Sequence, residues 1–222
     1  MTTLTTCRFD SRAELEAALA ERLGRALAAR GASAVMLSGG TTPLPAYRAL
    51  AARAPQHDDR LHVLYTDDRY VPESSEASNY HQIRPLTDAL ALPEESLLRV
   101  RTELPLEEAA ADYDRQLMAL LSSGVHIGLG LLGLGADGHT CSLFTGTDLE
   151  RARGRYAIPV RRPDGMAAVS VTPELLATVR EPLFVAAGAD KERALGSLLA
   201  RDPSLTAWRA VQGCSAAEVW MA

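Results

Sequence analysis

Apolar runs and amphipathic segments alternate along this 222-residue chain, and the alternation restricts its possible folds more than any other feature. Apolar residues recur at helical spacing in four segments, residues 11–30, 44–53, 79–90 and 106–121. Asp10 or Ser11 is suited to cap the first of these helices, and Gly31 to end it. Short apolar runs typical of buried strands lie at 34–37, 61–65 and 126–134. This order predicts an α/β fold with an open, mostly parallel, doubly wound (Rossmann-like) sheet and helices on both faces.

The last third of the chain keeps the alternation but places two strands in succession. Strand-like runs lie at 156–160, 167–171 and 182–187, and helical patterns at 173–178 and 190–199. The first two of these runs predict a small antiparallel excursion around residues 155–172. A glycine-rich turn at 135–139 is expected to lead into a short helix through Leu143. No internal repeat or linker interrupts the pattern, so we expect a single domain over residues 1–222.

The balance of charge excludes a generally cationic surface. The sequence has 23 Lys and Arg against 28 Asp and Glu, a net charge of -5, which argues against attraction to nucleic acid or to anionic membranes. Any anionic small molecule must therefore be bound by a local positive site. Lys191 is the only lysine, so arginine carries nearly all of the fixed positive side-chain charge.

Cysteine usage and the absence of a targeting signal predict a cytoplasmic protein. Cys7, Cys141 and Cys214 are odd in number and far apart, a pattern that indicates neither a disulfide framework nor a zinc knuckle. The first ten residues lack an apolar run that follows a basic region, and no stretch approaches the roughly 20 apolar residues of a membrane span. We expect neither secretion nor membrane insertion.

One match to a well-known motif is misleading. Gly128 to Gly133 reads G-x-G-x-x-G, the dinucleotide-binding fingerprint. In that fingerprint the glycines form the turn between a strand and a helix, whereas here they lie inside the apolar run that is itself predicted to be the strand. A nicotinamide or flavin site is therefore disfavoured, and the glycines are better explained by a close approach of neighbouring chain segments.

Three polar clusters follow predicted strands, where a doubly wound sheet gathers its ligands. The first comprises Ser38, Gly39, Gly40, Thr41, Thr42 and Pro43. Its consecutive backbone N–H groups and hydroxyls at the start of a helix suit a phosphate. It lacks the Gly-Lys-Ser/Thr sequence of a nucleotide-binding P-loop, which disfavours an NTPase. The alternative is an ordinary glycine-rich turn with proline at the helix start.

The second cluster, Asp67-Asp68-Arg69, places two carboxylates beside a guanidinium. Arg69 could pair with a carboxylate or hold a developing oxyanion, because its planar guanidinium is always charged. A surface ion pair is the alternative interpretation.

The third cluster runs from Gly135 to Phe144 and contains Asp137 and His139. An imidazole at a flexible turn, two residues after a carboxylate, has the parts of an oriented general base. Asp137 could orient the ring or bind substrate, and the alternative is a histidine that caps its own turn. Cys141 is better explained as a packing residue than as a nucleophile. The sequence contains neither a G-x-S-x-G elbow nor an H-E-x-x-H helix.

Together the three clusters resemble the 6-phosphogluconolactonase family, within the glucosamine-6-phosphate isomerase and deaminase group. The resemblance covers nearly the whole chain. The matching segments are Ser38 to Pro43 for S-G-G-x-T-P, Asp67 to Pro72 with Ser78-Asn79 for D-E-R-x-V-P and S-N, and Gly133 to Phe144 for G-x-G-x-D-G-H-x-A-S-L-F. It implies hydrolysis of 6-phospho-D-glucono-1,5-lactone to 6-phosphogluconate in the oxidative pentose phosphate pathway, without a cofactor or an obligatory metal.

The resemblance also assigns roles to individual residues. His139 would be the general base, with Asp67, Arg69 and Asp137 around the reaction centre and Arg69 on the oxyanion. Lys191, in Gly188-Ala189-Asp190-Lys191, matches a G-x-x-K whose lysine faces the substrate phosphate. The segment that would contribute to phosphate binding comprises Ser38, Gly39, Gly40, Thr41 and Thr42.

The sequence departs from the family pattern in several places. Asp68 replaces a usual glutamate, Cys141 a usual alanine, and Thr145 a usual proline. In addition, the family commonly has an arginine just before a V-T-L-T-like strand, where this chain has Met166-Ala167-Ala168. We expect Arg161 or Arg162 to supply that second phosphate cation.

Two other functions fit parts of the pattern. A glucosamine-6-phosphate deaminase or isomerase shares the family resemblance, but Arg69 stands where those enzymes usually have a tyrosine. A non-catalytic sugar-phosphate-binding module is a third hypothesis, against which the presence of both His139 and Arg69 argues. A monomer and a dimer are both compatible with the sequence.

Overall fold

The main sheet confirms the predicted α/β class. The computed structural model describes residues 2–222, and within them seven strands form one sheet in which every neighbouring pair is parallel. In sheet order the strands are β1 (Thr3–Arg8), β10 (Ala216–Met221), β9 (Glu181–Ala186), β6 (His126–Gly133), β2 (Ser33–Leu37), β3 (Leu61–Tyr65) and β5 (Leu97–Leu98). From β2 the chain proceeds to β3 and β5 on one side, then returns to β6 on the other. The strand order therefore reverses between β2 and β6, the position at which such sheets bind ligands.

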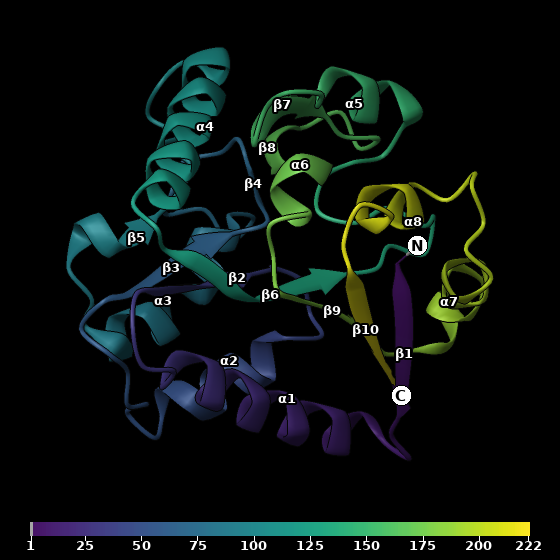
Figure 1. Cartoon of the computed structure of the whole chain (residues 1–222), viewed down its shortest axis with the longest axis horizontal. Coiled ribbons are helices and arrows are strands. Elements are labelled where there is room, and N and C mark those ends of the chain that lie inside the picture. Colours follow the sequence, from purple (N-terminus) through teal and green to yellow (C-terminus); the bar gives the residue numbers. More distant parts are fainter. Residues whose placement is uncertain (1) are drawn as a thin grey trace.

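Helices cover both faces of this sheet, as Figure 1 shows. One face packs against α1 (Arg12–Leu27), α2 (Leu44–Ala51) and α3 (Asn79–Leu90). The other packs against α4 (Leu106–Ser122), α6 (Pro173–Leu176), α7 (Glu192–Leu199) and α8 (Thr206–Val211). Alternate residues of β2 enter the two cores, Val35 and Leu37 on one face and Ala34 and Met36 on the other. Among the helices of the described chain, none has the length and apolarity needed to cross a membrane.

A second, smaller sheet lies above the main one and confirms the antiparallel excursion. Its strands are β4 (Asp67–Arg69), β8 (Ala167–Val171) and β7 (Ala157–Arg161), and both pairings are antiparallel. Thr66 alone separates β3 from β4, so the chain passes directly from one sheet to the other. This short connection carries the Asp67-Asp68-Arg69 cluster into the small sheet, a placement that the sequence does not predict.

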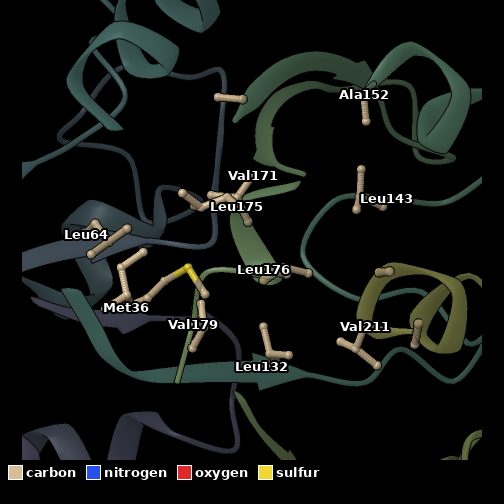
Figure 2. Packing of buried hydrophobic residues seen from close by; sticks show 14 of the residues in the cluster. Met36, Leu64, Leu132, Leu143, Ala152, Val171, Leu175, Leu176, Val179 and Val211 are labelled. Atoms are coloured by element: carbon tan, nitrogen blue, oxygen red, sulfur yellow. The ribbon is translucent and has the colours of Figure 1, made fainter. Parts of the chain in front are cut away.

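The core between the main sheet and α6 explains the glycines of β6. Figure 2 shows Met36 and Leu132 of the sheet beside Leu176 and Val179. A Cβ at Gly130 would lie 2.8 Å from Val179 Cγ1 and 2.9 Å from Met36 Cε. The G-x-G-x-x-G segment is therefore a buried strand, and its central glycine permits close packing rather than cofactor binding.

Several element boundaries differ from the expectations. Ser11 caps α1 by accepting a hydrogen bond from the Glu14 N–H, but the helix ends at Leu27, well before Gly31. The prediction of a short helix through Leu143 is wrong. Residues 134–145 form a loop, in which Thr140 and Leu143 make an isolated antiparallel β-bridge. The next helix, α5 (Gly146–Arg151), begins only after Thr145, which forms a capping box with Asp148.

The prediction did not include β1, β5, α8 or β10. The β1 segment Thr3–Arg8 is an exposed edge strand rich in threonine, and β5 has only two residues. Neither gives the apolar run by which buried strands are recognised. The 3₁₀ turn η1 (Glu94–Ser96) also lies outside the predicted pattern. A second one, η2 (Ala189–Lys191), occupies the start of the helix expected at 190–199, so α7 begins at Glu192.

Gly130→Ala should lower the free energy of unfolding by about 1–3 kcal/mol, because the added methyl group meets two buried side chains. Gly128→Ala is the matched control on the same strand, since its Cβ would meet only the Ala34 carbonyl at 3.8 Å. Urea denaturation of both variants measures the difference. Equal losses in the two variants would contradict the close-packing explanation.

Candidate active site

A cleft of about 280 Å³ opens where β2, β3, β6 and β9 end. It brings together ten of the residues that the sequence singled out: Ser38, Gly39, Gly40, Thr41, Thr42, Asp67, Arg69, His139, Arg162 and Lys191. Arg161 and Asp137 are not part of its lining. The three clusters thus meet at the predicted edge of the sheet, although they are up to a hundred residues apart in sequence.

The loop between β2 and α2 is held by contacts on both of its sides. The buried Tyr47 donates its hydroxyl to the Ser38 carbonyl oxygen at 2.8 Å, and Arg12 donates to the Thr41 carbonyl at 2.9 Å. Gly40 has φ +96°, which glycine adopts without strain. At Gly39 a Cβ would lie only 1.9 Å from Asn79 Oδ1, so the backbone there can approach α3 only without a side chain.

Asp67 and Arg69 lie in the cleft without pairing to each other. The two carboxylate oxygens of Asp67 accept hydrogen bonds from Thr66 Oγ1 at 2.8 Å and from Ser142 Oγ at 2.6 Å. Arg69 Nη1 donates instead to the Ala77 carbonyl at 3.0 Å and to Asn79 Oδ1 at 2.5 Å. The surface ion pair considered from the sequence is therefore not the arrangement found.

Asp68 is buried beside the cleft and organises its wall. Its carboxylate accepts hydrogen bonds from the Arg69 and Asn79 N–H groups, at 2.8 and 2.6 Å, and from Ser78 Oγ and the Tyr80 N–H, at 2.9 and 3.1 Å. Burial raises the pKa of Asp68 to about 6, although these hydrogen bonds act in the opposite direction. Asp68 thus joins β4 to the N-terminus of α3.

His139 is oriented by Asp137. The distance from His139 Nδ1 to Asp137 Oδ1 is 2.5 Å, and the His139 N–H also donates to that oxygen. Burial acts to raise the pKa of Asp137, but the hydrogen bonds from His139 outweigh it, so the pKa lies below the ordinary value. A Cβ at Gly135 would lie 2.1 Å from His139 Nδ1, so this turn requires glycine. With Nδ1 engaged, Nε2 is the ring nitrogen that remains for proton transfer.

The Phe144 ring lies close to both His139 and Arg162. The ring centroids of Phe144 and His139 are 4.3 Å apart, and the Arg162 guanidinium carbon lies 5.3 Å from the Phe144 centroid. Arg162 also donates to Ser142 Oγ at 3.4 Å and forms a salt bridge with Asp164 at 3.1 Å. Its neighbour Arg161 is exposed and lies outside the cleft.

The remaining candidates have simple environments. Lys191 lines the cleft, and its Nζ lies 3.3 Å from Oδ2 of the exposed Asp190. Burial raises the pKa of the Cys141 thiol well above its ordinary value, which agrees with a packing residue rather than a nucleophile. Within residues 2–222, no group of three His, Cys, Asp or Glu side chains is placed to hold a metal ion.

The sequence analysis missed three polar residues that shape this site: Thr66, Asn79 and Ser142. Thr66 and Asn79 line the cleft, and Ser142 bridges Asp67 and Arg162. Asn79 and Ser142 belong to the matched motifs, but a motif does not reveal which hydrogen bonds its polar side chains make.

Comparison with known proteins agrees with this geometry. Residues 10–220 match the model of the family described as glucosamine-6-phosphate isomerases/6-phosphogluconolactonase. The 6-phosphogluconolactonase of Synechocystis is 36% identical over 187 residues, covering 81% of this chain and 76% of that protein. The chain belongs to the 6-phosphogluconolactonase family. The human 6-phosphogluconolactonase is 35% identical over 208 residues, covering 86% of this chain and 80% of that protein.

Solved structures agree with the fold. The 6-phosphogluconolactonase of Thermotoga maritima superposes with a TM-score of 0.80 at 28% identity, covering 100% of this chain and 99% of that one. A monomeric glucosamine-6-phosphate deaminase superposes with a TM-score of 0.82 at 15% identity, covering 98% and 96% of the two chains. At that identity the second likeness concerns the fold alone. Both the family resemblance and the fold class expected from the sequence are confirmed.

The buried Asp68 carboxyl should make stability depend on pH. Its pKa is about 6 in the folded protein and near 3.8 in the unfolded chain. The folded state therefore binds the proton more tightly, and below about pH 4 protonation of Asp68 adds to the free energy of unfolding. As pH rises from about 4 to about 6 this contribution is lost, by roughly 3 kcal/mol. The difference in unfolding free energy between the protein and Asp68→Asn should therefore fall over that interval and then level off. Urea denaturation between pH 4 and pH 8 measures it, and a constant difference would contradict the raised pKa.

Proposed function

We propose that this protein hydrolyses 6-phospho-D-glucono-1,5-lactone to 6-phosphogluconate, with His139 as the general base. The observation that carries the proposal is that Asp137 orients His139 within a cleft that also contains Arg69 and the Ser38–Thr42 loop. A base, a fixed cation and a phosphate-binding loop are the groups that opening of a phosphorylated lactone needs. The relatives named above as 6-phosphogluconolactonases support the same reaction.

The hydrolysis proceeds through a tetrahedral intermediate. His139 Nε2 takes a proton from water while the water oxygen bonds to the lactone carbonyl carbon, and Arg69 stabilises the resulting oxyanion. The bond from this carbon to the ring oxygen then breaks, and the imidazolium returns its proton to that oxygen. Asp137 keeps Nδ1 protonated and stabilises the imidazolium between the two transfers. Asp67, whose oxygens each have remaining acceptor capacity, is placed to accept from substrate hydroxyls.

The substrate phosphate is bound by a local set of donors and cations. The Ser38–Thr42 loop supplies backbone N–H groups and hydroxyls, and Arg162 and Lys191 supply positive charge from two other loops. The family commonly has a phosphate-binding arginine just before the V-T-L-T-like strand. In this chain Arg162, rather than Arg161, supplies that positive charge, because only Arg162 lines the cleft. Arg162 and Lys191 also lie beside acidic neighbours, Asp164 and Asp190, with which the phosphate would compete.

His139→Asn should lower kcat/KM for the lactone by about 10²–10⁴-fold, the usual contribution of a general base. The assay uses freshly prepared lactone, and spontaneous opening is subtracted. His126→Asn is the matched control, since His126 lies at the opposite end of β6, outside the cleft. No hydrolysis above background in the wild type, or an undiminished rate in His139→Asn, would refute the proposal. Release of ammonia from glucosamine 6-phosphate would instead indicate the deaminase reaction.

Arg162→Ala should raise KM for the lactone by roughly tenfold or more, because it removes a positive charge that binds the substrate phosphate. A tenfold rise is equivalent to a loss of about 1.4 kcal/mol in binding free energy. Arg161→Ala should leave KM within about twofold, because its exposed side chain lies outside the cleft. Steady-state kinetics on the adjacent pair tests which arginine binds phosphate. An unchanged KM in Arg162→Ala, or an equal rise in both variants, would contradict this assignment.

A further inference from the structure

We propose that Asn79 is the positioning residue that holds Arg69 in the orientation needed to stabilise the oxyanion. This inference rests on the proposed lactonase function and adds a residue to which the family resemblance assigns no role. Asn79 is the first residue of α3 and is only 2% exposed. Its backbone N–H donates to the buried Asp68 carboxylate at 2.6 Å, which fixes the point from which its side chain extends.

Both ends of the Asn79 side-chain amide are engaged. Nδ2 donates to the Asp67 backbone carbonyl at 2.9 Å, and Oδ1 accepts from Arg69 Nη1 at 2.5 Å. The first bond determines which end of the amide faces Arg69, because the nitrogen can only donate and the oxygen can only accept. The amide therefore presents an acceptor to the guanidinium in a fixed direction.

These contacts hold Arg69 by one nitrogen and leave another edge of it unsatisfied. Nη1 has two acceptors, Asn79 Oδ1 and the Ala77 carbonyl. Nε is buried and has no hydrogen-bond partner in the described chain. Buried polar groups are rarely left without a partner, and Arg69 lines the cleft. The guanidinium is thus anchored through Nη1 on the side of α3, while Arg69 as a whole lines the cleft.

The same amide lies against the phosphate-binding loop. The space that a Gly39 Cβ would occupy is filled by Asn79, with Oδ1 only 1.9 Å from that point. Asn79 therefore keeps the loop after β2 and the arginine after β3 at a fixed separation. A substrate held at one end by its phosphate must present its carbonyl at a defined distance, and this contact sets that distance.

The neutral amide suits this role better than a carboxylate would. A carboxylate has the shape of the amide, but it cannot donate to the Asp67 carbonyl, and its negative charge would offset that of Arg69. An alanine would remove both bonds and leave Nη1 with the Ala77 carbonyl alone.

The test is a double-mutant cycle with Asn79→Ala and Arg69→Ala. Asn79→Ala should lower kcat at least about tenfold, and the same change should have less than about a twofold effect when Arg69 is already alanine. Additive losses would overturn the proposal, because they would show that Asn79 does not act through Arg69. If Asn79→Ala fails to fold, Asn79→Ser, which also lacks both amide contacts and adds no charge, takes its place in the cycle with the same expectations.

Ser78→Ala is the matched control, because Ser78 also bonds to Asp68 at the start of α3 but does not contact Arg69. Its melting temperature should fall while kcat stays within about twofold; a tenfold loss of kcat would indicate a general structural role for this helix start and overturn the proposal. Crystal structures of Asn79→Ala and Ser78→Ala provide a readout independent of turnover. The Arg69 guanidinium should move only in Asn79→Ala, and an unmoved guanidinium there would overturn the inference even if the wild type hydrolyses no lactone.

Discussion

The reversal of strand order between β2 and β6 is the constraint on which the rest of this structure depends. The chain leaves β2 toward β3 on one side of the sheet and later returns through β6 and β9 on the other. The loops that follow these strands diverge, so a cleft remains between them at the carboxyl edge. Parallel pairing brings all of these strand ends to one edge, so residues from distant parts of the sequence meet there.

The short passage from β3 into β4 determines the chemistry of this cleft. Thr66 is the only residue between the two strands, so the acidic cluster after β3 becomes part of a second sheet rather than a mobile loop. Antiparallel pairing with β8 fixes its backbone, and Asp68 fixes it from the side of α3. Arg69, the cation that this segment presents to the cleft, is therefore held by two sheets and a helix. It provides local positive charge in a protein whose net charge of -5 would otherwise repel anions.

Strand and helix periodicity predicted the fold class and the meeting of the three clusters, because both follow from local pattern and from the topology of parallel sheets. The sequence could not decide between Arg161 and Arg162. The two residues are adjacent at the end of β7, and neighbouring residues of an extended chain point in opposite directions. Which of the two side chains lines the cleft therefore depends on how the β7–β8 hairpin sits over the main sheet. Local pattern also failed at 140–143, where capping by Thr145 delays the helix.

Asp68 illustrates why such a site tolerates an unfavourable group. Burial disfavours its charged form, as its raised pKa shows, and a buried carboxylate is by itself weak evidence of stability. Its four hydrogen bonds, however, join the backbone of Arg69 to the first turn of α3, from which Asn79 reaches both Arg69 and the loop at Gly39. An apolar residue at position 68 would avoid the cost of burial but would leave these N–H groups without an acceptor. The buried carboxylate thus connects the backbone of β4 to the start of α3, rather than contributing to stability.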